Sequence, residues 1–287
     1  MQQRMGIFNF SIMMKPVIQP EELTELAKIT DIVIIDAGNI VSYGMQHLKG
    51  AVHADLNADL ANVPEDPANG GRHPLPDIPE FGKVLGRLGI GPQSHVVVYD
   101  DKNGALAAAR FWWMLRAAGH EKIQVLNGGI ASAARAGFML SDLVEMPIPA
   151  EPYVFAEWKL PTATIDDVEA AAADSEGTVV DVRAAARYRG ETEPIDTIAG
   201  HIPGAINIPY ETNLDAEGFF LSPEELEAKY KQALQGKKPE DAIIHCGSGV
   251  TACHAILSIS HAGLPLPKLY VGSWSEWSGK GKPVAVG

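Results

Sequence analysis

Five sequence landmarks occur twice in this chain, in the same order, once in each half. One of them is a predicted helix that ends at Ala118–Gly119 in the first half and at Ala262–Gly263 in the second. The other four are pairs of matching segments, namely 32–37 and 178–182, 47–52 and 201–206, 96–100 and 242–246, and 125–129 and 269–273. A fixed order of this kind is the signature of an internal repeat. The sequence therefore predicts two homologous domains.

The repeated unit alternates short apolar runs with helical patterns. Val96–Asp100 and Ala242–Cys246 each end at a polar residue, which is typical of a parallel strand buried on both faces. Ser222 with Pro223 and Glu225 has the pattern of a helix N-terminal capping box. This alternation predicts an α/β fold, in which each domain is a mostly parallel sheet with helices on both faces.

A stretch between the two halves holds Pro147, Pro149 and Pro152 and shows no sustained periodicity. We therefore expect a first domain over residues 14–142, a linker over 143–160 and a second domain over 161–287. Met13 and Met14 are alternative natural starts, so the sequence leaves open whether residues 1–13 are native.

The composition is that of a soluble globular protein, with 46% apolar and 21% charged residues. A formal charge of −13 argues against binding to nucleic acid or to anionic membranes. No apolar run approaches the roughly 20 residues of a membrane span, and a signal peptide is not evident. Two cysteines are too few for a disulfide framework and suit a reducing, cytoplasmic location.

The loop that begins at Cys246 is the first candidate for chemistry. Ligands of parallel α/β sheets bind beyond the carboxyl ends of the strands, where Cys246 lies. Gly247 and Gly249 let the backbone bend tightly around the sulfur, and a helix that begins near Val250 adds a positive dipole end. Both effects favour the thiolate, which is the nucleophilic form. Cys253 lies within that helix and is expected to be a small core side chain.

Three other interpretations of this loop are weaker. Its glycine spacing matches the dinucleotide fingerprint, but no acidic residue follows at the required distance. A cysteine-phosphatase loop needs an arginine where this chain has Ala252. The spacing of His245, Cys246, Cys253 and His254 does not converge four ligands on a metal, so we expect no metal site.

These residues resemble a known family, the tandem-domain rhodaneses, and within it the 3-mercaptopyruvate sulfurtransferases. The resemblance runs from about Met14 to the C-terminus. It is carried by CGSGVTACH from Cys246, GHIPGAINIP from Gly200, RYRG from Arg187, RFWWMLRAAGH from Arg110 and GSWSEW from Gly272. The uncharged CGSGVTAC loop is specific for the mercaptopyruvate branch.

The resemblance implies a role for each of several residues. Cys246 would be the nucleophile and would carry sulfur as a persulfide. Ser248 and His73 would assist proton transfer to the leaving group, and Arg187 would hold the carboxylate of the donor. The anion cradle would be formed by Gly247, Gly249, Val250, Thr251 and Ala252. The family needs no metal or organic cofactor, and the first domain would cover the site.

The chain also departs from the family pattern. Asn57 occupies the position of an acidic partner of the histidine, with Asp55 and Asp59 close by. Asp196 stands where a second substrate arginine is expected, and Val271 replaces an aspartate. Asp100 or Asp101 stands where the first domain would have its own thiol.

We therefore expect a sulfurtransferase in which Arg187 acts without a second arginine. The donor stays open between 3-mercaptopyruvate and thiosulfate, and the acceptor would be cyanide, a thiol or a thioredoxin-like protein. The alternative is a non-catalytic rhodanese-type module that binds a partner.

Overall fold

The computed structural model describes residues 14–287, so the origin of residues 1–13 lies outside the described part of the chain. The strands of the first half are β1 (Val17–Ile18), β2 (Ile32–Asp36), β3 (His47–Leu48), β4 (Ala51–His53), β5 (His95–Tyr99), β6 (Ile123–Leu126) and β7 (Leu140–Ser141). Those of the second half are β8 (Thr162–Ala163), β9 (Val179–Asp181), β10 (Ile206–Asn207), β11 (Ile243–His245) and β12 (Lys268–Tyr270).

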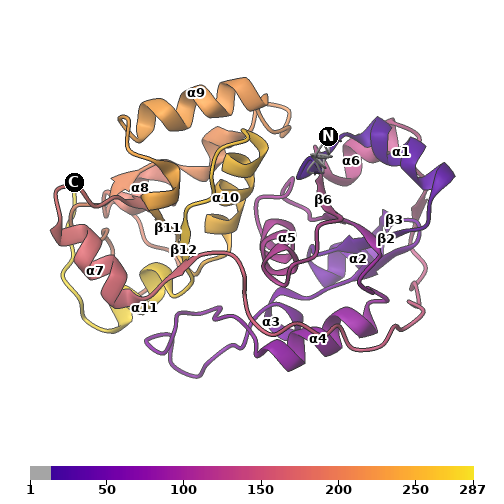
Figure 1. Cartoon of the computed structure of the whole chain (residues 1–287), viewed down its shortest axis with the longest axis horizontal. Coiled ribbons are helices and arrows are strands. Elements are labelled where there is room, and N and C mark those ends of the chain that lie inside the picture. Colours follow the sequence, from indigo (N-terminus) through magenta and orange to yellow (C-terminus); the bar gives the residue numbers. More distant parts are fainter. Residues whose placement is uncertain (1–13) are drawn as a thin grey trace, which may run out of the picture.

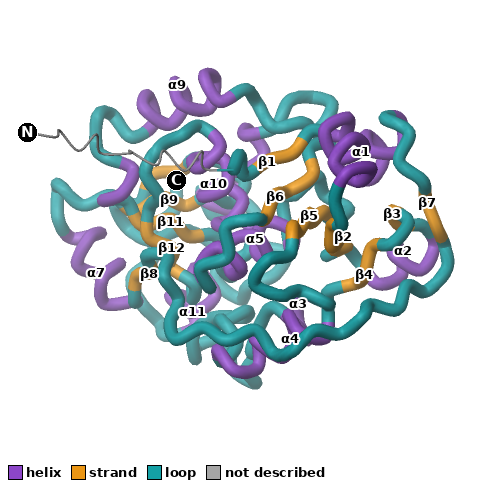
Figure 2. The backbone as a smooth tube through the Cα atoms, turned by 45° about the vertical axis from the view of Figure 1, so that its right-hand side comes forward, coloured by secondary structure: helices purple, strands orange, loops and turns teal. Residues whose placement is uncertain are grey.

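Each half forms a five-stranded sheet, and the two sheets have the same topology. The first has the order β1-β6-β5-β2-β4, and the second, written in the same direction, has the order β8-β12-β11-β9-β10. Every strand pair within these two sheets is parallel, and both sheets are visible in Figure 2. β3 and β7 form a separate antiparallel pair. The predicted duplication of a parallel α/β unit is confirmed.

The helices of the first half are α1 (Pro20–Ile29), α2 (Ile40–Met45), α3 (Leu56–Asp59), α4 (Ile78–Arg87), α5 (Ala107–Ala117) and α6 (Gly129–Arg135). Those of the second half are α7 (Ile165–Ala173), α8 (Ala185–Tyr188), α9 (Pro223–Ala233), α10 (Thr251–His261) and α11 (Ser273–Gly279), with short 3-10 turns at Tyr210–Asn213 and Pro239–Asp241. The capping box predicted at Ser222 is present at the start of α9. The C-cap residues of α5 and α10 are Ala118 and Ala262, and the glycine after each has a positive φ, as predicted.

Helices cover both faces of each sheet because neighbouring strand residues point in opposite directions. Val96 and Val98 of β5 pack in one apolar cluster with residues of α4 and α5. Val97 and Tyr99 pack in another cluster, with residues of α1 and α6. The predicted double covering of the sheets is therefore confirmed.

One apolar core runs from the first half into the second. α5 and α10 face each other at the centre of Figure 1, and the same cluster holds Trp112 and Trp113 of α5 together with Ile256 and Leu257 of α10. Each fully buried side chain of this size contributes about 1.5–3 kcal/mol relative to an exposed one. The two halves are thus joined by a continuous apolar core.

The stretch between β7 and β8, where the sequence predicts the linker, contains no helix or strand but is held by the first half. Its backbone N–H groups at Ala150 and Tyr153 donate to the carbonyls of Gly86 and Gly82 of α4, at 2.8 and 2.9 Å. A side chain at either glycine would collide with this stretch. None of the helices in residues 14–287 is long and apolar enough to cross a membrane.

Candidate functional site

Cys246 follows directly after β11, at the carboxyl end of the central strand of the second sheet. Its exposed fraction is 2%, so this side chain is buried in the structure. Gly249 has a φ of +74°, and a Cβ there would lie 2.5 Å from the carbonyl oxygen of Val271, so this position requires glycine. Val250 is the N-cap of α10, Thr251 begins the helix and Ala252 is buried.

The equivalent loop of the first half shows what this geometry can hold. Asp100 follows β5 as Cys246 follows β11, and its buried carboxylate accepts four backbone N–H bonds. The donors are Lys102, Gly104, Leu106 and Ala108, at 2.8–3.1 Å. Burial raises the pKa of Asp100, and these four bonds oppose that shift. A loop of this repeat can therefore surround an anion with backbone donors.

The Cys246 loop does not surround its sulfur with backbone donors in the same way. In the described chain, no loop N–H forms a hydrogen bond to the sulfur, so the predicted cradle of Gly247 to Ala252 stays a prediction. The Cys246 N–H instead donates to Ser273 Oγ at 3.2 Å, and the Cys246 carbonyl accepts from Trp274 N at 3.0 Å. The start of α11 thus fixes the backbone of the cysteine.

Ser273 itself has a left-handed backbone, with a φ of +53°. Its counterpart in the first half is Gly129, with a φ of +62°. A non-glycine residue in this region is strained, and such strain concentrates at functional sites. The sequence signal for this strain is a serine in place of the glycine of the repeat.

The loop between α3 and α4 extends from the first half to this site. Figure 1 shows it extending beneath the second half toward α11. Gly71 lies so close to the backbone of Gly272 that no Cβ fits, and Arg72 N donates to Ser275 Oγ at 3.1 Å. These contacts fix the loop just before His73.

His73, Ser248 and Asn57 form a continuous hydrogen-bonded chain. His73 Nε2 lies 3.1 Å from Asn57 Oδ1, and His73 Nδ1 lies 2.8 Å from Ser248 Oγ. Because an amide oxygen only accepts, Nε2 carries the proton in this arrangement and Nδ1 accepts from the serine hydroxyl. The two neighbouring carboxylates are engaged elsewhere, since Asp55 caps α3 and Asp59 pairs with Arg87. Asn57 is therefore the third member of this chain.

Burial, together with the charges of Arg110 and Arg72, lowers the pKa of His73 to about 4. No carboxylate offsets these effects, so the imidazole is neutral at physiological pH. Arg110 is completely buried, and its Nη2 donates to the His73 carbonyl at 2.9 Å while Nη1 donates to the Gly249 carbonyl at 3.3 Å. This guanidinium joins the histidine of the first half to the cysteine loop of the second.

Arg187 lies on α8, and its guanidinium approaches the same loop. It is bound by Glu193 at 2.6 Å and by Asp196 at 3.4 Å. Asp196 also forms an ion pair with Arg72 from the first half. Both guanidinium groups lie over Gly247, so the expectation of a lone arginine at this site is wrong.

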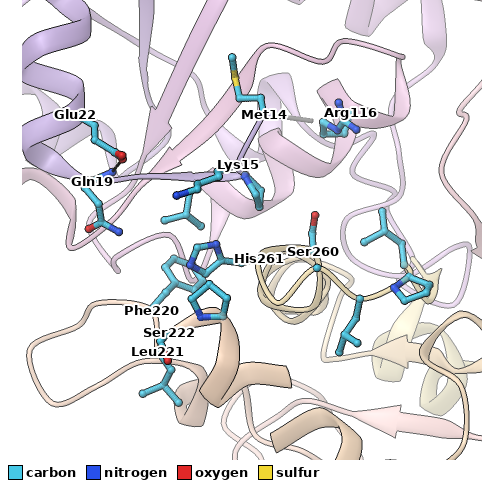
Figure 3. Close-up of a pocket in the computed structure, with 17 residues that line it drawn as sticks. Met14, Lys15, Gln19, Glu22, Arg116, Phe220, Leu221, Ser222, Ser260 and His261 are labelled. Carbon is cyan, nitrogen blue, oxygen red and sulfur yellow. Dashed lines mark hydrogen bonds between the residues drawn. The ribbon is translucent and has the colours of Figure 1, made fainter. Parts of the chain in front are cut away.

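A cavity of about 820 Å³ lies on another part of the molecule. Figure 3 shows it between the first described residues, such as Lys15, and the second-half residues Phe220 and His261. None of the residues from Cys246 to Thr251 lines it. The predicted site is therefore separate from this cavity.

Cys253 packs in the apolar core with an exposed fraction of 0%, and burial raises its pKa to about 12. Because only thiolates alkylate rapidly, iodoacetamide is expected to leave Cys253 unmodified in the folded protein and to label Cys246 first. Peptide mass spectrometry before and after unfolding measures this. Labelling of Cys253 at the rate of a free thiol in native protein would contradict its placement in the core.

The site thus unites the predicted residues Cys246, Ser248, His73 and Arg187. Sequence reasoning missed Arg72, Arg110 and Ser273. Arg72 is adjacent to a predicted site residue, and Arg110 lies in a segment that carried the family resemblance. Neither fact shows that the side chain reaches the other half of the chain.

Comparison with known proteins agrees with this architecture. The rhodanese-like domain family matches residues 19–136 and 164–280. A probable 3-mercaptopyruvate sulfurtransferase from Pseudomonas aeruginosa is 41% identical over 249 residues, which cover 85% of this chain and 86% of the relative. The human 3-mercaptopyruvate sulfurtransferase is 38% identical over 247 residues, covering 84% and 80%.

The solved structure of 3-mercaptopyruvate sulfurtransferase from Leishmania major superposes with a TM-score of 0.79 at 31% identity, covering 93% of this chain and 75% of that one. The two matched domains, the shared sheet topology and the sequence identities to these relatives together identify the family. The chain belongs to the rhodanese family, as a tandem-domain member of the branch that contains the 3-mercaptopyruvate sulfurtransferases.

Proposed function

We propose that this chain is a sulfurtransferase in which Cys246 takes sulfur from a small anionic donor, holds it as a persulfide and passes it to a thiophilic acceptor. The observation that carries the proposal is the meeting of three groups at one loop. Cys246 lies at the end of β11, the Ser248–His73 pair lies in the same loop region, and the guanidinium of Arg187 lies over Gly247. These are a nucleophile, a proton carrier and an anion-binding group.

The donor reaction forms one sulfur–sulfur bond. The Cys246 thiolate attacks the outer sulfur of the donor, and the bond between that sulfur and the rest of the donor breaks. From 3-mercaptopyruvate, the carbon–sulfur electron pair leaves with the pyruvate enolate, which then takes up a proton. From thiosulfate, the sulfur–sulfur pair leaves with sulfite. The backbone N–H groups that surround the Asp100 side chain support a role for Gly247 to Ala252 in holding the resulting persulfide anion.

The hydrogen-bonded chain of Asn57, His73 and Ser248 suits 3-mercaptopyruvate as the donor. The thiol proton of 3-mercaptopyruvate must leave the sulfur, and the enolate carbon must gain a proton. Ser248 Oγ, hydrogen-bonded to neutral His73, can give its proton to one partner and take one from the other. Thiosulfate needs neither transfer, because sulfite leaves as an anion. The arrangement therefore favours 3-mercaptopyruvate.

In the second half-reaction, an acceptor such as cyanide, a small thiol or a thioredoxin-like dithiol attacks the outer persulfide sulfur and regenerates Cys246. No metal or organic cofactor takes part in this scheme. The first domain, residues 14–142, contributes His73 to the site. It performs no transfer of its own, because Asp100 occupies the position of a thiol.

Intact-mass spectrometry after incubation with each donor tests the proposal. A mass gain of one sulfur atom is expected, removed by cyanide or dithiothreitol and absent in Cys246→Ser. Cys253→Ala is the matched control and should gain the same mass. If neither donor adds sulfur to the unmodified protein, the chain is instead a rhodanese-type binding module.

A further inference from the structure

Arg72, which the first half supplies, lies beside Arg187 at the proposed donor site. From this position we infer that the two arginines together bind the anionic group of the donor, with Asp196 holding both in place. This inference rests on the proposed function and deepens it, because it names a donor-binding residue from the other domain. Arg72 and Asp196 are 124 positions apart in the sequence.

The two guanidinium groups converge on one point. A Cβ built on Gly247 would lie 3.1 Å from Arg72 Nη2, 3.5 Å from Arg187 Nη2 and 3.6 Å from Arg187 Nη1. Gly247 follows the nucleophilic cysteine directly, so this point belongs to the loop that carries the cysteine. The absence of a side chain at Gly247 leaves space there for a ligand group.

The carboxylates of Asp196 and Glu193 bind some of the guanidinium nitrogens and leave others free. Asp196 pairs with Arg72 Nη1 and with Arg187 Nη2, and Glu193 takes Arg187 Nε and Nη2. Arg72 Nη2 and Arg187 Nη1 form no hydrogen bond with any residue in the described chain. Of the three nitrogens that face Gly247, these two are therefore available to a ligand.

The pair also stays in contact with solvent. The side chain of Arg72 is 21% exposed and that of Arg187 is 17% exposed, whereas Asp196 is only 7% exposed. The buried carboxylate thus orients two guanidinium groups that remain partly exposed. Two such donors suit a carboxylate or sulfonate, whose oxygens each accept a charge-assisted hydrogen bond.

Donor kinetics and donor binding test the inference independently of each other. Arg72→Ala is expected to raise the donor KM roughly 10- to 100-fold, the effect of losing a charged hydrogen bond, and to leave the acceptor KM unchanged. Arg72→Lys keeps the charge and the pair with Asp196 but loses the fork, so an intermediate KM is expected. Gly247→Ala fills the shared point without removing a charge and should also raise the donor KM.

Binding is measured by calorimetry in the Cys246→Ser background, where thiosulfate and 3-mercaptopyruvate can bind without reacting. Arg72→Ala should weaken this binding by the same factor. The matched control is Arg189→Ala, because Arg189 lies two residues from Arg187, pairs with Glu191 and is 45% exposed away from the loop. It should change neither KM nor affinity.

The outcomes separate the two proposals. Absence of a persulfide in the unmodified protein overturns the proposed function, while a loss of affinity in Arg72→Ala would still support the anion site. A donor KM and an affinity within twofold of the unmodified protein in Arg72→Ala overturn the inference even if sulfur transfer is normal. An equal rise in the donor and acceptor KM would also overturn it, because that pattern indicates general disruption of the site.

Discussion

Replacing Cys246 with serine is expected to reduce sulfur transfer from either donor by at least about 10⁴-fold, because removal of a nucleophile eliminates the covalent route. The serine hydroxyl has nearly the same size, and Cys246 is buried, so the fold should persist. Steady-state release of pyruvate or sulfite with cyanide as acceptor measures the loss.

The second cysteine provides the control for that experiment. Cys253→Ala removes one buried sulfur from the apolar core and should keep turnover within a fewfold, with a modest loss of thermal stability. Transfer by Cys246→Ser at a rate near that of the unmodified protein would show that the persulfide forms elsewhere.

Replacing His73 with alanine is expected to slow transfer from 3-mercaptopyruvate by about 10²- to 10⁴-fold, the usual contribution of a general acid–base group. Transfer from thiosulfate should fall much less, because its leaving group takes up no proton. Ser248→Ala should show the same difference between donors, since Ser248 is the direct hydrogen-bond partner of His73. Comparable losses with both donors would contradict the proton-transfer role.

The pH dependence gives a second measure of the same role. The pKa of His73 is lowered to about 4, so the imidazole is neutral above that value and becomes protonated as the pH falls through it. The rate ratio of the unmodified protein to His73→Ala with 3-mercaptopyruvate, which cancels the titration of Cys246, should therefore hold down to about pH 5 and decline below. Asn57→Asp places a carboxylate against Nε2, which favours the protonated form and should move this decline upward by about 1–3 pH units. If the decline stayed at the same pH in Asn57→Asp, a group other than His73 would limit the rate at low pH.

Much of the fold was predictable because its signals are local. Parallel strands buried on both faces need continuous apolar runs, and the chain shows these runs twice with the same loops and caps. The duplication also identified Asp100 as the counterpart of Cys246. The sequence could not show that four N–H groups surround Asp100, because the conformation of a loop depends on its tertiary contacts.

The candidate site was only partly predictable. Cys246 could be identified from its loop, while His73, Ser248 and Arg187 followed from the family resemblance. The sequence predicted a site with a single substrate arginine because position 196 alone was compared with the family pattern, which has an arginine there. In the structure, a loop of the other half places Arg72 against that aspartate, so the charge that one position lacks is supplied from another domain.

The sequence by itself determined the duplicated α/β fold and the position in the second half of the cysteine that the proposed chemistry requires. Only the tertiary structure decided which groups surround that cysteine. The physical reason is that α5 and α10 share one apolar core, which fixes the two halves against each other. Arg72, His73 and Arg110 of the first half then reach the loop of the second, and no local pattern encodes such contacts.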